Sequence, residues 1–186
     1  MNRLYVFGAL TLALGACSSP SWPEFGAVGA TANILNSGGY KIGEATFAER
    51  KDGGVDMQLQ AWDLPPGVYA MHIHEAGFSD PPDFQTTGGH FNPYGRKHGL
   101  SNPQGPHAGD MPNLVVPEDG KVSIVITLRE VTLKEGNNNS LLRPQGTSLV
   151  IFSDPDDQKT DPGGNSGMRI ASGVIRAVST EAIDLR

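Results

Sequence analysis

All five histidines of this 186-residue chain fall within one stretch of 36 residues, residues 72–107. Two of them, His72 and His74, are separated by a single residue. In a β-strand, alternate side chains point to the same face, so these two imidazoles could bind one metal ion together. A lone histidine is more often a structural residue, and histidines on a disordered surface loop are the other ordinary explanation. Five histidines gathered in one segment favour a metal site.

The other three histidines are followed by an aspartate at short spacings. His90, His98, His107 and Asp110 form the pattern His-x7-His-x8-His-x2-Asp. Three imidazoles and one carboxylate suit a closed tetrahedral zinc site, in which zinc–nitrogen bonds are about 2.0–2.1 Å long. The glycine- and proline-containing segments around His90 and His98 indicate specific turns rather than disorder. We therefore expect this segment to bind zinc.

The elements that must position these side chains are short strands. Segments that alternate between apolar and polar residues are separated by Gly, Pro, Asn and Asp clusters, and none has helical periodicity. The predicted fold class is an all-β sandwich or barrel of about eight strands. Two long loops, 75–110 and 154–167, complete it, and loops of this length are uncommon unless they are functional. The strands are expected within residues 30–35, 43–49, 55–62, 67–74, 120–133, 148–153 and 168–178.

The N-terminus has the features of a bacterial lipoprotein signal. Arg3 precedes an apolar run, residues 4–16, that is too short to span a bilayer. The run ends in "LGAC", which resembles a lipobox with Cys17 as the residue that is lipidated. An ordinary secretory signal with an incidental cysteine is the alternative.

This interpretation divides the chain into a signal peptide (1–16), a tether (17–26) and one folded domain (27–186). A lipid on Cys17 would anchor the protein in the cell envelope. The anchor would lie in the outer membrane or periplasm of a Gram-negative host, and on the outer face of the cell membrane of a Gram-positive one. Loss of Arg3 from 14 basic residues leaves 13 against 20 acidic residues, a formal charge of −7, which gives no indication of a nucleic-acid partner.

Four motifs closely resemble those of the copper/zinc superoxide dismutase family, and the resemblance covers about residues 28–178. The family resemblance implies an eight-stranded Greek-key β-barrel with a metal-binding loop and an electrostatic loop. It also implies a copper ion and a zinc ion that share one bridging imidazole, with superoxide as the substrate. The motifs are "MHIHEAG", "TGGHFNPYGRKHG", "PHAGDMPN" and "DPGGNSGMRIASGVI".

The same resemblance assigns roles to individual residues. Asp156 corresponds to a carboxylate that orients one zinc-side ring and one copper-side ring from behind. Arg169 corresponds to the arginine beside copper that attracts and positions superoxide. The implied copper ligands are His72, His74 and the bridging His90, and the implied zinc ligands are His90, His98, His107 and Asp110.

One departure from the family pattern concerns copper. The position of the fourth copper ligand is occupied by Phe152. Strand alternation agrees, because Leu149 and Ile151 would face the core and Phe152 would face the metal. A phenyl ring has no ligand atom, and no histidine follows His107, although Asp154 could offer an oxygen. We expect zinc binding to survive and copper binding to be weak or absent.

A second departure concerns the family's intrachain disulfide. The resemblance places its two cysteine positions at Ser79 and Ser172, and Cys17 is the only cysteine in the chain. A disulfide typically contributes about 2–4 kcal/mol to stability. Because a structural zinc site also contributes folding free energy, zinc is the expected substitute.

Three functions are compatible with these residues. The first is a superoxide dismutase that works with three histidine copper ligands, which Arg169 favours. The second is a non-enzymatic zinc-binding lipoprotein, which Phe152 favours. The third is a copper(I)-binding or copper-handling lipoprotein that uses His72 and His74. We favour a family member with zinc bound, in which conversion of superoxide to hydrogen peroxide and oxygen is weak or absent.

Overall fold

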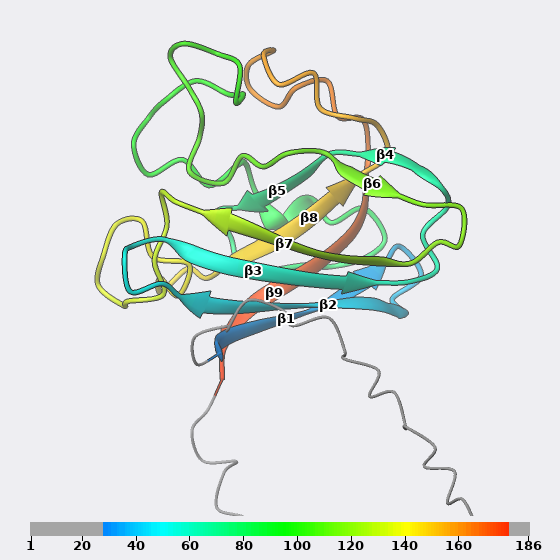
Figure 1. Ribbon diagram of the computed structural model, residues 1–186, viewed down its shortest axis with the longest axis horizontal. Coiled ribbons are helices and arrows are strands. Elements are labelled where there is room, and N and C mark those ends of the chain that lie inside the picture. The colour runs from blue at the N-terminus through cyan, green and yellow to red at the C-terminus, as the bar shows by residue number, and fades with distance from the viewer. Residues whose placement is uncertain (1–27, 179–186) are drawn as a thin grey trace, which may run out of the picture.

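The computed structural model describes residues 28–178, which form an all-β structure with one short 3-10 turn, η1 (Gln85–Thr87) (Figure 1). Within this range no helix is long and apolar enough to cross a membrane. The strands are β1 (Val28–Asn36), β2 (Lys41–Glu49), β3 (Val55–Ala61), β4 (Gly67–Tyr69), β5 (Met71–His74), β6 (Leu114–Val116), β7 (Val122–Leu128), β8 (Thr147–Phe152) and β9 (Arg169–Ala177).

Seven strands form one curled antiparallel sheet in the order β5-β8-β9-β1-β2-β3-β7, and β4 pairs with β6 in a second, two-stranded sheet. Strands distant in the sequence, such as β1 and β9 or β3 and β7, are direct neighbours. Such connections between non-consecutive antiparallel strands are those of a Greek key. The predicted all-β Greek-key architecture is confirmed.

The nine strands exceed the seven segments expected from the sequence, because the segment 67–74 is interrupted at Ala70 and β6 is additional. The Ala70 N–H donates to the carbonyl of Asp154, and the Ala70 carbonyl accepts from the N–H of Phe152. The chain therefore leaves its pairing with β6 and joins β8 within two residues. The three-residue strand β6 was not predicted, because so short a segment carries little periodicity.

The core lies on the inner face of the curled sheet. Along β3 the alternation expected from the sequence is observed, since Val55, Met57 and Leu59 are fully buried and the residues between them are partly exposed. Burial of each such side chain stabilises the fold by about 1.5–3 kcal/mol. The same alternation on β5 directs Met71 and Ile73 into this core.

The opposite side of β5 carries His72 and His74. They lie across from Val150 and Ser148 of β8. On that side, Ala70, Val150 and Phe152 form a small apolar cluster separate from the main core. Phe152 thus lies outside the main core, on the side of the sheet that carries the two histidines.

The metal-binding loop (75–110) and the electrostatic loop (154–167) lie side by side at one end of the barrel, at the top of Figure 1. The Ser101 N–H donates to the carbonyl of Gln158 at 3.1 Å, and Lys97 forms an ion pair with Asp161 at 2.9 Å. Gly99 has φ +105°, and a Cβ at that position would overlap the carbonyl of Gln158. Glycine there allows the two loops to pack directly against each other.

Candidate metal centre

Strand β5 presents two imidazoles, each fixed by a hydrogen bond to one ring nitrogen. His72 Nε2 donates to Asp156 Oδ2 at 2.7 Å. His74 Nδ1 donates to the carbonyl of Gly88 at 2.9 Å and lies 3.1 Å from Thr87 Oγ1. The other nitrogens, His72 Nδ1 and His74 Nε2, are buried and without a hydrogen-bond partner among the described residues. A ring held from behind with a free, buried nitrogen in front is the usual arrangement of a metal ligand.

A second group of nitrogens surrounds Asp110. Its Oδ1 atom lies 3.0 Å from His90 Nδ1, 3.1 Å from His98 Nδ1 and 3.3 Å from His107 Nδ1. The Nδ1 atoms of His90 and His107 are 3.4 Å apart. Ligands of a tetrahedral zinc ion are separated by about 3.3 Å when the bonds are about 2.0 Å long. The four residues therefore fit a zinc ion.

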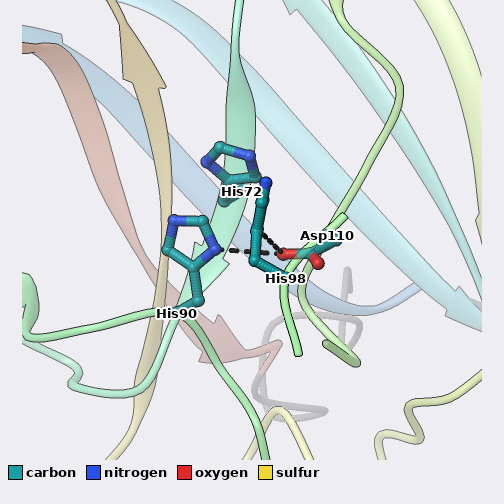
Figure 2. A group of neighbouring side chains, drawn as sticks. All are labelled: His72, His90, His98 and Asp110. Atoms are coloured by element: carbon teal, nitrogen blue, oxygen red, sulfur yellow. Dashed lines mark hydrogen bonds and ion pairs between the residues drawn. The ribbon is translucent and has the colours of Figure 1, made fainter. Parts of the chain in front are cut away.

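The two groups form one continuous cluster, of which Figure 2 shows His72, His90, His98 and Asp110. Potential ligand atoms of these four residues all lie within 4.8 Å of one another. The ring centroids of His72 and His90 are 4.0 Å apart, and those of His90 and His107 are 5.5 Å apart. His90 thus stands between the copper-side and zinc-side histidines, where the family resemblance places a bridging ring.

Asp156 lies behind the cluster and connects its two sides. Its carboxylate accepts from His72 Nε2 on one oxygen and lies 3.0 Å from His98 Nε2 through the other. The main chain of Asp156 exchanges two hydrogen bonds with the amide of Asn113, at 2.8 and 2.9 Å. Gly164, at φ +65°, leaves room for this carboxylate, because a Cβ there would overlap both Asp156 and His98. Asn113 and Gly164 therefore support the orientation of both rings.

The charges of the metal-free cluster follow from burial and carboxylate contacts. Burial lowers the pKa of His90 to about 4. Burial also opposes protonation of His98, but hydrogen bonds to Asp110 and Asp156 outweigh it and raise the pKa of His98 to about 9. Burial would raise the pKa of Asp110, but its histidine contacts hold that pKa well below the usual range. Without metal, one proton therefore resides on His98 at neutral pH.

Arg169 begins β9 and points across the mouth of the cluster. Its guanidinium donates to the carbonyls of Phe84 and Gly88 at 3.0 and 2.8 Å, and to Gln85 Oε1 at 3.2 Å. The Gly88 carbonyl also accepts from His74. Arg169, His74, His90 and Phe152 line a cavity of about 500 Å³ beneath the electrostatic loop. A cationic group fixed at such an opening attracts small anions.

Phe152 lies directly beside the copper-side rings. Its ring centroid is 5.3 Å from that of His72, 5.6 Å from that of His74 and 6.4 Å from that of His90. Asp154 does not join them. Its exposed carboxylate accepts from the Ser153 hydroxyl at 2.8 Å. The side of the cluster that the family resemblance assigns to copper therefore has three imidazoles and a phenyl ring.

Two other expectations concern residues outside this cluster. The hydroxyls of Ser79 and Ser172 are both buried without a hydrogen-bond partner among the described residues. Cys17, the expected lipidation site, lies outside the described residues.

Several supporting residues were missed by sequence reasoning. Thr87 and Gln85 act from η1, the carbonyl of Gly88 holds both His74 and Arg169, and Asn113 holds Asp156. Hydrogen bonds to a backbone carbonyl cannot be predicted from the sequence, because every residue has one. Asn113 was visible only as part of the "PHAGDMPN" motif.

Comparisons with known proteins agree with this architecture. Residues 41–175 match the family model for copper/zinc superoxide dismutase. Superoxide dismutase (Cu-Zn) 1 of Aquifex aeolicus is 51% identical over 146 residues, which cover 78% of this chain and 86% of the relative. The superoxide dismutase-like protein YojM of Bacillus subtilis is 36% identical over 189 residues, covering 94% of this chain and 96% of the relative.

Comparison with solved structures also finds proteins of this family. The crystal structure of a double mutant of a SOD-like protein from Bacillus subtilis, with two residues changed to histidine, has a TM-score of 0.75 and 40% sequence identity. It covers 77% of this chain and 95% of that chain. By sequence and by fold, this chain belongs to the copper/zinc superoxide dismutase family.

Proposed function

We propose that this protein is a zinc-binding lipoprotein of the cell envelope, in which dismutation of superoxide to hydrogen peroxide and oxygen is weak or absent. The observation that carries the proposal is the position of Phe152, whose ring stands 5.3 Å from His72 and 5.6 Å from His74 where a fourth imidazole is expected. Contacts of His90, His98 and His107 with Asp110 support the zinc part of the proposal.

Zinc binding is supported by the donor set and its spacing. His90, His98, His107 and Asp110 would hold the ion, with Asp156 behind His98. Because zinc has no redox chemistry, its role here is structural. It ties the metal-binding loop to the barrel in a chain that lacks the family's disulfide.

Loss of dismutation follows from ligand chemistry. Copper, when bound, supplies the one-electron redox chemistry that dismutation needs. Copper(II) favours a tetragonal set of nitrogen and oxygen ligands. This chain offers three imidazoles, and Phe152, only 7% exposed, fills the fourth side with an apolar ring. Arg169 can still attract an anion, but the site beside it is incomplete.

Metal analysis together with a superoxide assay tests this proposal. The purified protein should contain about one zinc per chain, and added copper should produce little superoxide decay beyond that of free copper. A functional dismutase with three histidine ligands is the competing account, and the anchored guanidinium of Arg169 favours it. Full activity with stoichiometric copper would establish that account instead.

The envelope location rests on the "LGAC" motif that ends at Cys17. Mass spectrometry of the native protein should find a lipid on Cys17. An unmodified N-terminus beyond that residue would refute the anchor without affecting the metal site.

A further inference from the structure

The outer face of strands β2 and β3 carries a polar groove that is separate from the histidine cluster. Glu44 lies directly across from Gln60, and Thr46 lies directly across from Gln58. Residues opposite each other in antiparallel strands share a face, so these four side chains form one compact array. Together with Trp62 they line a groove of about 280 Å³. The alternate residues of both strands belong to the main core, so the groove lies on the outside of the barrel (Figure 1).

An indole ring borders one end of this groove. Trp62 directly follows β3 and is 36% exposed. Its main-chain N–H donates to the carbonyl of Ile42 at 2.8 Å, which fixes the backbone that carries the ring. A partly exposed indole offers a large apolar face and one N–H donor. Such a face can pack against the C–H groups of a sugar ring, while polar neighbours bond the hydroxyls of that sugar.

The polar groups of the groove are available to a ligand. Among the side-chain hydrogen bonds of residues 28–178, the one that involves this lining joins Lys41 Nζ to Glu44 Oε2 at 2.7 Å, and the side chains of Thr46, Gln58 and Gln60 form none. An amide side chain has two N–H donors and an accepting oxygen, and a hydroxyl both donates and accepts. These groups therefore complement a ligand whose own groups are hydroxyls and amides.

The charge of this face favours a neutral ligand. Two cross-strand rows pass through the groove, and Glu44 is their only charged residue, already paired with Lys41. Exposed positions more commonly carry Lys, Arg, Glu or Asp. Neighbouring strands are about 4.8 Å apart, so each four-strand row is about 14 Å long, enough for more than one sugar ring. The rows are Asn33, Glu44, Gln60 and Ser123, and Thr31, Thr46, Gln58 and Val125.

The pairing of the strands argues against a peptide as the ligand. An extended peptide that adds to a sheet needs a strand edge with unpaired backbone groups. Both β2 and β3 are paired on each side, in the order β1-β2-β3-β7. The groove therefore offers side chains rather than backbone, and its lining includes no aliphatic side chain that could anchor an apolar residue.

We propose that the outer face of β2 and β3 binds a neutral carbohydrate chain. Trp62 packs against one sugar ring, and Gln58 and Gln60 bond the hydroxyl or acetamido groups of that ring and its neighbour. The metal ions take no part in this binding, so the inference goes beyond the proposed function and does not depend on it.

Titration of the zinc-loaded protein with two neutral oligosaccharides tests the proposal. Chitohexaose carries acetamido groups and cellohexaose carries hydroxyls alone, so the pair also shows which of these groups is recognised. At least one should bind with a Kd below about 1 mM by calorimetry. Nuclear magnetic resonance shifts should be confined to the groove and include the indole N–H of Trp62. Absence of binding by both would refute the site, as would tighter binding of a sulfated glycan such as heparin.

Substitutions in the groove test its residues. Trp62→Ala should weaken binding about tenfold or more, and Gln58→Ala combined with Gln60→Ala should weaken it about tenfold. The matched control is Tyr40→Ala, which removes an aromatic side chain that is 74% exposed and outside the groove, and which should leave the affinity unchanged. Circular dichroism and zinc content would show that each variant is folded. Wild-type affinity in folded Trp62→Ala would overturn the proposal.

Discussion

The zinc side and the copper side of the histidine cluster share a scaffold and differ in how their nitrogens are satisfied. On the zinc side, three Nδ1 atoms converge on Asp110 at 3.0–3.3 Å. On the copper side, two ring nitrogens are unpartnered and the Phe152 ring stands next to them. The first set comes from one loop, whereas the second needs β5, β8 and the loop together. A single substitution on β8 therefore changes the surroundings of the copper-side histidines without altering any of the four residues on the zinc side.

The strongest way to reverse this difference is Phe152→His. The new imidazole would stand on β8 beside His72, His74 and His90, with Arg169 already anchored. We expect copper(II) affinity to rise and dismutase activity to increase by orders of magnitude, since a missing ligand is restored. Copper titration and a superoxide assay measure both. Loss of the phenyl ring costs packing, so unfolding should be measured separately. A folded variant without additional copper(II) binding would show that position 152 does not face the metal.

Zinc binding should be lost when the Asp110 carboxylate is removed. Asp110→Ala deletes the group on which three histidines converge, and we expect zinc affinity to fall by more than about 100-fold. Zinc removal from the wild type should lower Tm by a similar amount to this substitution, because binding free energy contributes to folding. The matched control is Asp154→Ala, an exposed carboxylate outside the cluster. Thermal unfolding of the wild type and both variants, with and without a chelator, measures these changes in Tm. An unchanged Tm after chelation would mean that the loop is held by other contacts.

The raised pKa of His98 makes zinc binding dependent on pH. His98, with a pKa of about 9, must release a proton to bind zinc, whereas His90, with a pKa of about 4, is already neutral. Zinc affinity should rise about tenfold per pH unit between about pH 6 and pH 8. Calorimetry in buffers of different protonation enthalpy should detect the proton released. No release at neutral pH would contradict a protonated His98.

The raised pKa of His98 has the opposite effect on the stability of the metal-free protein, which should fall as pH rises. A histidine whose pKa is raised by folding stabilises the fold fully below its unfolded pKa of about 6.5. That contribution of His98 is lost as pH rises through about 9. The metal-free protein should therefore lose stability across the range in which zinc binding strengthens, and denaturant unfolding at several pH values checks this.

Introducing a disulfide at the family's two cysteine positions tests whether zinc takes over its stabilising role in this protein. The double substitution Ser79→Cys and Ser172→Cys removes two buried, unpartnered hydroxyls. The oxidised variant should gain about 2–4 kcal/mol of stability, and its Tm should depend less on zinc. Thiol titration reports bond formation, and the reduced variant is the control. Free thiols after oxidation would show that these two positions do not meet.

The smallest effect is expected at the contact between the two long loops. Lys97 and Asp161 form an ion pair at 2.9 Å, with side chains 55% and 36% exposed. Exposed pairs contribute about 0–1 kcal/mol and are screened by salt. Lys97→Ala should change Tm slightly at low salt and not at high salt. A large effect on zinc affinity would instead indicate that the electrostatic loop controls the zinc side.

The sequence predicted those features that depend on side-chain alternation and ligand type. The inward face of β3 and the shared face of His72, His74 and Phe152 follow directly from a period of two. The break at Ala70 could not be predicted, because it depends on which strand the backbone pairs with. Nor could the hydrogen bond of His74 to Gly88, whose acceptor is a backbone carbonyl.

The central claim, that Phe152 leaves the copper side unable to support dismutation, is tested most directly by stopped-flow measurement of superoxide decay. The zinc-loaded wild-type protein would receive one equivalent of copper per chain, and metal analysis would report how much copper it retains. The account predicts a rate per bound copper far below that of the Phe152→His variant measured in parallel. A wild-type rate equal to that of the variant, with copper still bound, would contradict it.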